Sequence, residues 1–318
     1  MSVLVTGGTG SLGYHLLSLF TKTKGDLISY SHTPSVSYRF LKHVTYYEED
    51  LLNEKALRKV LEKHMPDEIY HIAAQNSVGV SQKNPYHTLK TNILGTQCLF
   101  ECVRKVIPKS RIVFISSCEL YGGGRGIVDI VHKETDEIIP LTPFATSKAS
   151  CELLVKQYIN AFKMDIIVVR PFHFAGPSQS MHYVLPSVAR QIAEIEIYDG
   201  ELVVYTGNLD ISRDILDVRD LARGIALLFP CGKTGEIYNI CSGKARTIRE
   251  LVENVIQISK QPIDIRIDPS LERSQDIPLL AGSPEKMMGL TGWKPIISIE
   301  DSLKDLYTEM KKRIQAVD

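Results

Sequence analysis

The stretch Val3-Leu4-Val5-Thr6-Gly7-Gly8-Thr9-Gly10-Ser11-Leu12-Gly13 decides the fold. A short apolar run comes first, glycines follow at every third position, and the apolar-rich segment 15–20 then continues as a helix. Glycines allow a tight turn and a close approach of backbone N–H groups to a pyrophosphate, and the helix N-terminus adds a positive dipole. This strand–turn–helix context predicts dinucleotide binding at Gly7, Gly10 and Gly13. A purely structural tight turn is the alternative.

Strands and helices alternate outward from this stretch. The expected strands, after the one at 3–5, are 27–30, 68–72, 111–115 and 165–169, and the expected helices are 54–63, 85–106 and 146–162. The strands are apolar throughout, which is typical of a parallel sheet covered by helices on both faces. We therefore predict an α/β fold with a doubly wound parallel sheet of the Rossmann type.

The pattern loosens after Pro177. The segments 178–180 and 199–213 are loop-rich, and two late helices are expected at 248–259 and 299–314. Ligands of open parallel sheets bind at the carboxyl ends of the strands. We predict a dinucleotide-binding domain over 1–177 and a smaller ligand-binding domain over 178–318 that closes over this end, with some of its segments returning to the sheet.

Composition excludes several classes of partner. The chain has 318 residues, is 44% hydrophobic and has a formal net charge of zero, so nothing indicates a nucleic-acid surface. No run of about 18 apolar residues predicts a membrane span. The six cysteines lack Cys-x-x-Cys spacing, which favours reduced thiols in a cytoplasmic protein. Cys98 and Cys102 lie one helical turn apart, but no neighbouring ligand completes a metal site, so we predict none.

The end of the second strand selects the nicotinamide cofactor. An acidic residue there would bind the ribose 2′-hydroxyl, whereas a 2′-phosphate needs cations. The chain has Tyr30-Ser31-His32-Thr33 with Arg39 nearby, which favours NADP(H) over the alternative, NAD(H). His32 is otherwise an ordinary surface histidine. Asp50 and Leu51 follow the next strand and are placed to meet the adenine, unless Asp50 caps the following helix.

Residues suited to proton transfer follow the strand that ends at Ile115. They are Ser117, Cys118 and Glu119, with Phe144 and Lys148 downstream. In a hydride-transfer site a hydroxyl holds the substrate oxygen, and a lysine holds the cofactor ribose and lowers the pKa of a phenol that exchanges the proton. Glu119 is expected to act as a base or to orient hydroxyls. Cys118 is expected to pack, with weak-acid chemistry as the alternative.

These motifs resemble the extended short-chain dehydrogenases/reductases that act on nucleotide sugars. The resemblance runs nearly end to end, through Thr6–Gly13, His71-Ile72-Ala73-Ala74, Ser116–Gly122, Phe144–Lys148 and Arg170-Pro171-Phe172. In the C-terminal half, the segments 176–180, 189–192, 207–214, 238–243 and 291–295 are most similar to GDP-4-keto-6-deoxy-mannose reductases and GDP-mannose 4,6-dehydratases.

The resemblance implies further site residues. Thr9, Ser11, Leu12, Ala73 and Lys148 would bind the cofactor. Arg213 and Arg273 would grip the diphosphate of a GDP-sugar and Arg190 would help to hold the nucleotide, in keeping with the match of guanidinium forks to phosphate oxygens. Any one of the three arginines is otherwise a surface residue.

The remaining substrate contacts implied by the resemblance come from the residues after the strands. Ser117 and Cys118 would touch the substrate. His173 replaces a common asparagine and would still hydrogen-bond the sugar. A homodimer is implied through the helices 85–106 and 146–162.

Phe144 departs from the family pattern, because the segment Phe144-Ala145-Thr146-Ser147-Lys148 has phenylalanine where a Tyr-x-x-x-Lys motif has the catalytic tyrosine. Phenylalanine has no titratable group. Three interpretations stay open: an engineered substitution in an enzyme, a natural variant in which Ser117, Cys118 or Glu119 handles the proton, or a binding protein without turnover. The predicted reaction is NADPH-dependent C4 reduction of a GDP-4-keto-6-deoxy-hexose or heptose, with a 4,6-dehydratase as the alternative.

Overall fold

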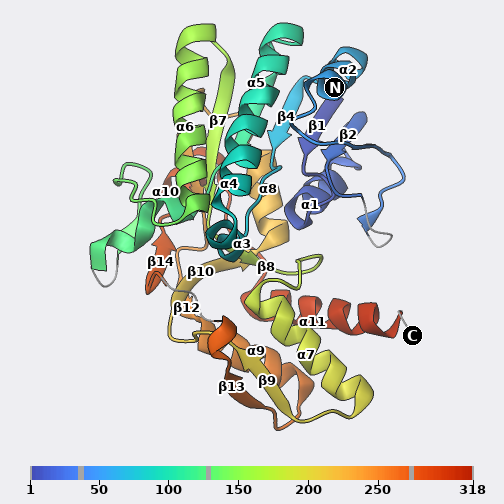
Figure 1. Cartoon of the computed structure of the whole chain (residues 1–318), viewed down its shortest axis with the longest axis vertical. Helices are drawn as coiled ribbons and strands as arrows, with labels where there is room; N and C mark the ends of the chain where they lie inside the picture. The colour runs from blue at the N-terminus through green and yellow to red at the C-terminus, as the bar shows by residue number, and fades with distance from the viewer. Residues whose placement is uncertain (1, 35–38, 127–129, 272–275, 317–318) are drawn as a thin grey trace.

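A seven-stranded parallel sheet forms the centre of the protein, which we describe from a computed structural model covering residues 2–34, 39–126, 130–271 and 276–316 (Figure 1). The strands lie in the order β11-β7-β5-β4-β1-β2-β3. Their bounds are β1 Ser2–Thr6, β2 Asp26–Ser31, β3 Val44–Glu48, β4 Glu68–His71, β5 Arg111–Ile115, β7 Asp165–Pro171 and β11 Ile237–Ile240. The predicted doubly wound parallel sheet is confirmed.

The sheet is apolar throughout because both of its faces are buried. Val3 and Val5 of β1 pack in one hydrophobic cluster, whereas Leu4 between them packs in the cluster on the opposite face. Successive side chains of a strand point to opposite faces. A sheet covered on both sides therefore requires apolar residues at every position, as the sequence shows.

Helices cover the two faces. One face carries α1 Ser11–Phe20 and α8 Val218–Leu228, which pack against each other and share the cluster around Val3 and Val5. The other face carries α2 Glu54–His64, α5 Gly95–Val106 and α6 Pro143–Phe162. Both α8 and β11 come from the chain after residue 177, so later segments of the chain return to the large sheet and its helical cover.

The long helix expected at 85–106 is not a uniform α-helix. It consists of α4 Pro85–Leu89, the π-helical turn η2 Lys90–Leu94 and α5, and it follows the short helix α3 Val78–Lys83. A π turn arises where a local interaction outweighs regular i→i−4 bonding, and it is frequent at functional sites. The helix expected at 146–162 begins earlier, at Pro143, because Thr142 accepts a hydrogen bond from Ala145 N and proline suits the first helical position.

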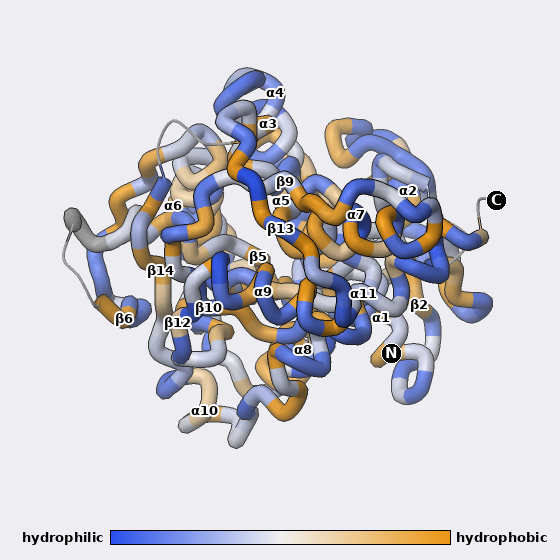
Figure 2. Tube along the Cα trace, turned by 90° about the horizontal axis from the view of Figure 1, so that it is seen from below, coloured by the Kyte–Doolittle hydropathy of each residue, from blue (hydrophilic) through white to orange (hydrophobic). Residues whose placement is uncertain are grey.

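A third hydrophobic cluster holds the C-terminal part together, below the sheet in Figure 1. Its helices are α7 Val184–Tyr198, α9 Ile248–Ser259 and α11 Ile299–Gln315. The segment 199–213, expected to be loop, contains β9 Val203–Thr206, which pairs with β13 Asp264–Ile267. Figure 2 views this end from below and shows hydrophobic and hydrophilic positions mixed along α7, as expected for a helix with one buried face.

A smaller mixed sheet connects the two parts. Its strands are β6 Val131–His132, β8 His173–Ala175, β10 Ser212–Asp217, β12 Ala245–Thr247 and β14 Leu279–Gly282. The short helix η3 Cys118–Gly126 contacts β14, α10 Glu285–Thr291 contacts β11, and η4 Pro269–Leu271 follows β13. Since β8 follows β7 directly and pairs with β10, this sheet lies at the carboxyl end of the large one. Across the described ranges, no helix is long and apolar enough to cross a membrane.

Candidate active site

The glycine loop lies at the carboxyl end of β1, where the strand order reverses. Gly10 N donates to Gly7 O at 3.0 Å, and Gly10 precedes the first turn of α1. Gly7 has a φ of +73°, and a Cβ on it would lie 2.9 Å from Ala73 N. A Cβ on Gly13 would lie 2.2 Å from Gly7 O. Any side chain at Gly7 or Gly13 would therefore break the turn, which explains these two glycines.

The residues present fit a dinucleotide. Ser11 Oγ, in the first turn of α1, is buried and has no hydrogen-bond partner among the described residues. It lies beside the helix N-terminus, where free backbone N–H groups attract a phosphate. Leu12 is buried against the sheet and Ala73 N donates to Thr6 Oγ1 at 3.2 Å. The predicted residues Gly7, Gly10, Ser11, Leu12 and Ala73 thus surround one turn.

The predicted nucleoside-binding residues lie at the ends of β2 and β3. His32 is exposed immediately after β2. Asp50 Oδ1 accepts from Leu52 N at 2.9 Å and its carbonyl accepts from Tyr30 Oη at 3.1 Å, while Leu51 is buried. The alternative role for Asp50 is wrong, because Asn53 is the residue that caps α2.

Arg39 joins the glycine loop to the C-terminal part. Its Nη1 donates to Thr9 O at 2.9 Å, and its Nη2 donates to Ser178 O. Thr9 is tied a second time, because its Oγ1 donates to Thr33 O at 2.9 Å. The guanidinium therefore lies next to the dinucleotide loop, where a cation would meet a phosphate.

Lys148 reaches from α6 to the end of β5. Its Nζ donates to Ile115 O at 2.7 Å, and burial lowers its pKa to about 8 although Cys151 and Glu152 lie near. Phe144, one turn earlier on the same face of α6, is buried. The two side chains therefore lie on one face of α6, and their places in the predicted catalytic set stay predictions.

Four polar residues, which we call the outer cluster, meet at the adjacent ends of β5 and β7: Ser117, Cys118, Glu119 and His173. Glu119 N donates to Ser117 Oγ at 3.1 Å. His173 Nε2 lies 3.3 Å from Glu119 Oε1, and His173 Nδ1 lies 3.9 Å from Cys118 Sγ. Burial raises the pKa of the Cys118 thiol, so this group stays neutral and is a poor proton donor.

A second set, the inner network, lies behind the outer cluster and was not predicted from the sequence. It consists of Ser116, Tyr121, Glu152, Arg170 and Asn239. Arg170 forms a bidentate ion pair with Glu152, at 2.9 and 2.7 Å, and Ser116 Oγ donates to the same carboxylate at 2.6 Å. Tyr121 accepts from Arg170 Nη1 at 3.0 Å and donates to Asn239 Oδ1 at 2.8 Å.

The inner network also decides whether Tyr121 can replace the missing phenol. The hydroxyl is fully buried and bonded on both sides, and burial raises its pKa to about 12. It therefore holds its proton at neutral pH. Tyr121 has a structural role in this arrangement.

Asn92 is a further site residue that the sequence did not reveal. It lies in the π turn η2, and its side chain accepts from Gln75 N at 2.8 Å and donates to Gln75 O and to Ser147 Oγ, at 3.0 and 2.8 Å. These bonds fix the loop after β4 against α6 beside Lys148. The π turn gives the Asn92 side chain its position, and the spacing of apolar residues does not predict such a turn.

The three predicted phosphate-binding arginines have different surroundings. Arg213 is buried next to Cys118, and its Nη1 donates to Ser212 O and Ile277 O at 2.9 and 2.6 Å. Arg190 is on α7 and pairs with Glu194 at 2.6 Å. Arg273 lies outside the described residues. Their contacts with a diphosphate stay predictions.

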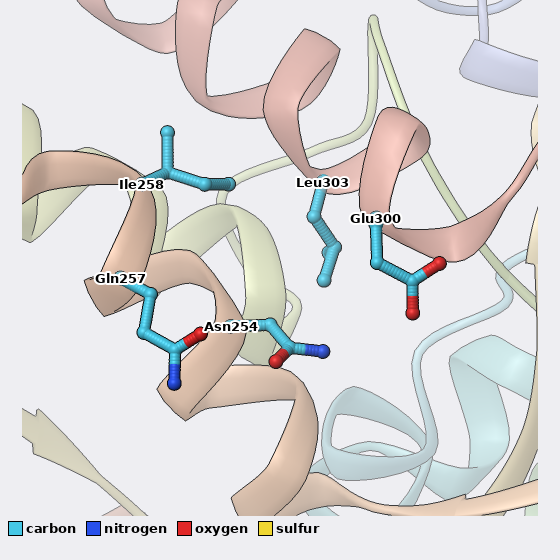
Figure 3. Close-up of a pocket in the computed structure, with 5 residues that line it drawn as sticks. All are labelled: Asn254, Gln257, Ile258, Glu300 and Leu303. Atoms are coloured by element: carbon cyan, nitrogen blue, oxygen red, sulfur yellow. The ribbon is translucent and has the colours of Figure 1, made fainter.

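One pocket lies apart from this edge of the sheet. It has a volume of about 220 Å³ and lies between α9 and α11, lined by Asn254, Gln257, Ile258, Glu300 and Leu303 (Figure 3). None of its lining residues belongs to the predicted site. Within the described parts of the chain, no group of three or more His, Cys, Asp or Glu side chains could hold a metal ion.

Comparison with known proteins agrees with this geometry. The family model described as GDP-mannose 4,6 dehydratase matches residues 4–306. The chain is 31% identical to a GDP-6-deoxy-D-mannose reductase of Pseudomonas aeruginosa, over 98% of both chains. The structure of RMD from Pseudomonas aeruginosa complexed with NADPH has a TM-score of 0.84 at 30% identity, with 98% of this chain and all of that one covered.

A more distant solved structure shares the same fold. The Thermus thermophilus UDP-glucose 4-epimerase in complex with NAD has a TM-score of 0.87 at 25% identity, with 98% of this chain and 99% of that one covered. Together with the reductase match, it confirms the predicted resemblance to nucleotide-sugar enzymes of the short-chain dehydrogenase/reductase type. The chain therefore belongs to the GDP-mannose 4,6 dehydratase family.

Proposed function

We propose that this protein is an NADPH-dependent oxidoreductase that reduces the C4 ketone of a GDP-4-keto-6-deoxy-hexose or heptose. The observation that carries the proposal is the convergence of two sites at one edge of the sheet. The glycine loop before α1 supplies a dinucleotide site, and the ends of β5 and β7 place Ser117, Glu119 and His173 close to Lys148 on α6. Ligands of such sheets bind across this edge.

The chain's own residues have distinct roles in this reaction. The bound cofactor supplies the hydride. Lys148 binds the ribose, Ser117 donates a hydrogen bond to the substrate oxygen, and Glu119 and His173 hold sugar hydroxyls. Arg213, Arg190 and Arg273 bind the GDP diphosphate and nucleotide. Burial of Phe144 and Cys118 keeps water away from the reacting carbon.

Two observations support NADP(H) over NAD(H). No carboxylate follows β2, where an acid would bind the ribose 2′-hydroxyl, and the Arg39 guanidinium lies beside the glycine loop. The similar reductase structure was determined with NADPH, whereas the epimerase structure has NAD. Measuring Kd for both cofactors tests the preference, and a tighter Kd for NAD would reverse it.

A 4,6-dehydratase is the second candidate, because Glu119 is a carboxylate in the place for a base at C5. That reaction also needs an acid for the departing 6-hydroxyl. Cys118 is the adjacent group, and its buried thiol has a raised pKa. This poor acid favours the reductase.

The experiment supplies GDP-4-keto-6-deoxy-mannose with NADPH, and separately GDP-mannose with no added cofactor, to the protein and to Phe144→Tyr. Mass spectrometry identifies the products. A reductase consumes NADPH and adds two hydrogens to the keto sugar. Restoring the phenol should raise the rate by no more than about 10⁴-fold, the upper end of what general acid catalysis usually contributes. Conversion of GDP-mannose without added NADPH would identify a dehydratase. Binding of GDP-sugar without turnover by either protein would identify a binding protein.

We also propose a cytoplasmic homodimer and a ligand-binding domain over 178–318. Large apolar side chains are exposed on the helices named for the dimer, at Tyr86, Leu94, Leu153 and Phe162. Exposed apolar patches of this kind favour an interface between subunits. Light scattering of the protein and of Leu153→Glu tests the assembly, and a monomer in both would contradict it.

A further inference from the structure

We propose that His173 donates the proton that completes ketone reduction in this chain, in place of the phenol that Phe144 lacks. The inference rests on the proposed reductase function and gives His173 a catalytic role beyond sugar binding. It assigns Glu119 as the residue that positions the imidazole. The argument depends on where the two residues lie, how exposed they are and which ring nitrogen is held.

The sheet brings His173 to the reacting edge. β5 and β7 are neighbouring parallel strands, and Ser116 N donates to Val169 O at 2.7 Å at their ends. Glu119 follows β5 and His173 follows β7, so residues 54 apart in sequence meet at 3.3 Å. Lys148 donates to Ile115 O at the end of the same β5. The imidazole and the lysine therefore flank the end of one strand.

Exposure distinguishes His173 from its neighbours. About 30% of its side chain is exposed, against 9% for Glu119, while Cys118, Phe144 and Lys148 are nearly or fully buried. A proton donor must contact the substrate and must also regain its proton after each turnover. His173 is the member of the outer cluster that is exposed enough to contact the substrate and to take up a proton from solvent. Histidine is also the side chain that changes protonation near neutral pH.

The two ring nitrogens have unequal partners. Nε2 faces the Glu119 carboxylate at 3.3 Å, and this contact fixes the plane of the ring. Nδ1 has a long contact, 3.9 Å, to the neutral thiol of Cys118. The proton on Nδ1 is thus held more weakly, and Nδ1 is the atom that delivers it.

Other charges near the cluster come from the neighbouring strand β10. Arg213 lowers the pKa of the Cys118 thiol and Asp214 raises it, so their charges act in opposite directions. Asp214 in turn accepts hydrogen bonds from Ser242 and Gly243. With these charges opposed, the carboxylate of Glu119 is the charge that contacts the imidazole directly.

The proposed step balances. The ketone carbon gains a hydride from the reduced nicotinamide, which is thereby oxidised, and the carbonyl electron pair moves to oxygen. That oxygen takes the proton from His173 Nδ1 and becomes the alcohol. The neutral imidazole then takes a proton from solvent, and Glu119 stays ionised throughout.

The test measures kcat against pH for the protein, for His173→Asn and for the matched control His43→Asn, an exposed histidine beside β3. We expect kcat to fall as the pH rises above neutrality, because a histidine side chain loses its proton near neutral pH and the protonated ring is the donor. His173→Asn should lower kcat by about 10²-fold, the lower end of what a general acid contributes, and abolish this pH dependence. His43→Asn should keep both.

Rescue separates proton donation from sugar binding. Phe144→Tyr should restore the His173→Asn variant to within about tenfold of Phe144→Tyr alone, because the phenol then supplies the proton. If the loss in His173→Asn reflects sugar binding, the Kd for GDP-sugar will weaken and the added phenol will not restore kcat. Unchanged kcat and pH profile in His173→Asn would also overturn the proposal. Absence of NADPH-dependent reduction in every variant would instead reject the reductase function.

A readout without turnover checks the positioning role of Glu119. NMR of the His173 ring in the ligand-free protein should show shifted ring signals and a more mobile ring in Glu119→Gln than in the unmodified protein, because the carboxylate no longer holds Nε2. The His43 ring signals should not change. Unchanged His173 ring signals would show that Glu119 does not position the imidazole.

Discussion

Ser116 and Ser117 are neighbours in the chain but belong to different polar assemblies, and the contrast separates structure from chemistry. Ser116 joins the inner network, whose side chains are buried and linked by bonds of 2.6–3.0 Å. Ser117 joins the outer cluster, whose contacts run from 3.1 to 3.9 Å and include the part-exposed His173. The short, satisfied bonds hold the strand ends rigid, and the longer contacts leave groups able to bind a ligand.

Removing the ion pair between Arg170 and Glu152 should cause the largest loss of stability and is the strongest test of the difference between the two assemblies. Arg170→Met leaves the Glu152 carboxylate buried without its cation, which typically costs about 3–5 kcal/mol. We expect the free energy of unfolding in urea to fall by about that amount. Arg58→Met, which removes an exposed i,i+4 pair with Glu62, is the matched control and should leave the free energy of unfolding nearly unchanged. Similar losses in both variants would show that the inner network is not a structural core.

Lys148 provides the next largest effect, with a defined pH dependence. Its folded-state pKa of about 8 lies below the ordinary value of 10.5, so between these values the unfolded chain binds more protons and stability rises with pH. At pH 7 the buried charge costs at most about 3 kcal/mol. Lys148→Met should therefore unfold at a higher urea concentration than the unmodified protein at pH 7. The difference between the two urea concentrations should become smaller near pH 10.

The control for Lys148 is Lys55→Met, an exposed position on α2. It should leave the dependence of stability on pH as it is in the unmodified protein. A gap between Lys148→Met and the unmodified protein that stays constant with pH would contradict a lowered pKa for this lysine.

The smallest stability change is expected in the outer cluster. Glu119→Gln preserves the shape of the side chain and keeps a hydrogen-bonding group facing the part-exposed His173, so the free energy of unfolding should fall by less than in Arg170→Met. Turnover of the keto sugar should fall nevertheless, because Glu119 positions His173. A loss of stability as large as that of Arg170→Met would place Glu119 in the structural core and would remove the distinction between the two assemblies.

Much of the fold was predictable because it depends on local patterns. The apolar run at β1 and the glycines after it specify a strand, a turn and a helix without reference to distant residues. The predictions were weaker where distant segments pair. β9 pairs with β13 some sixty residues later, and the sequence of 199–213 predicts a loop because neither strand has a strong pattern alone.

The residues of the candidate site also differ in whether a local motif predicts them. Gly7, Gly10, Gly13 and Lys148 could be named from motifs, since each motif lies within one short stretch. The roles of Arg190 and Arg273 stay predictions, and the part played by Asn92 was missed. A π turn in a helix aims that side chain at Gln75 and Ser147, and helical periodicity does not reveal such a turn.

The sequence by itself determined the parallel sheet, the dinucleotide loop and the absence of a phenol at Phe144. Spacing and residue type are properties of the chain and need no partner. Only the tertiary structure decided which polar groups meet at the end of β5. His173 and Glu119 are 54 residues apart, and they meet because β5 and β7 are neighbours in the sheet and end at the same edge. Strand order is set by the packing of the whole domain, so no short stretch of sequence contains it.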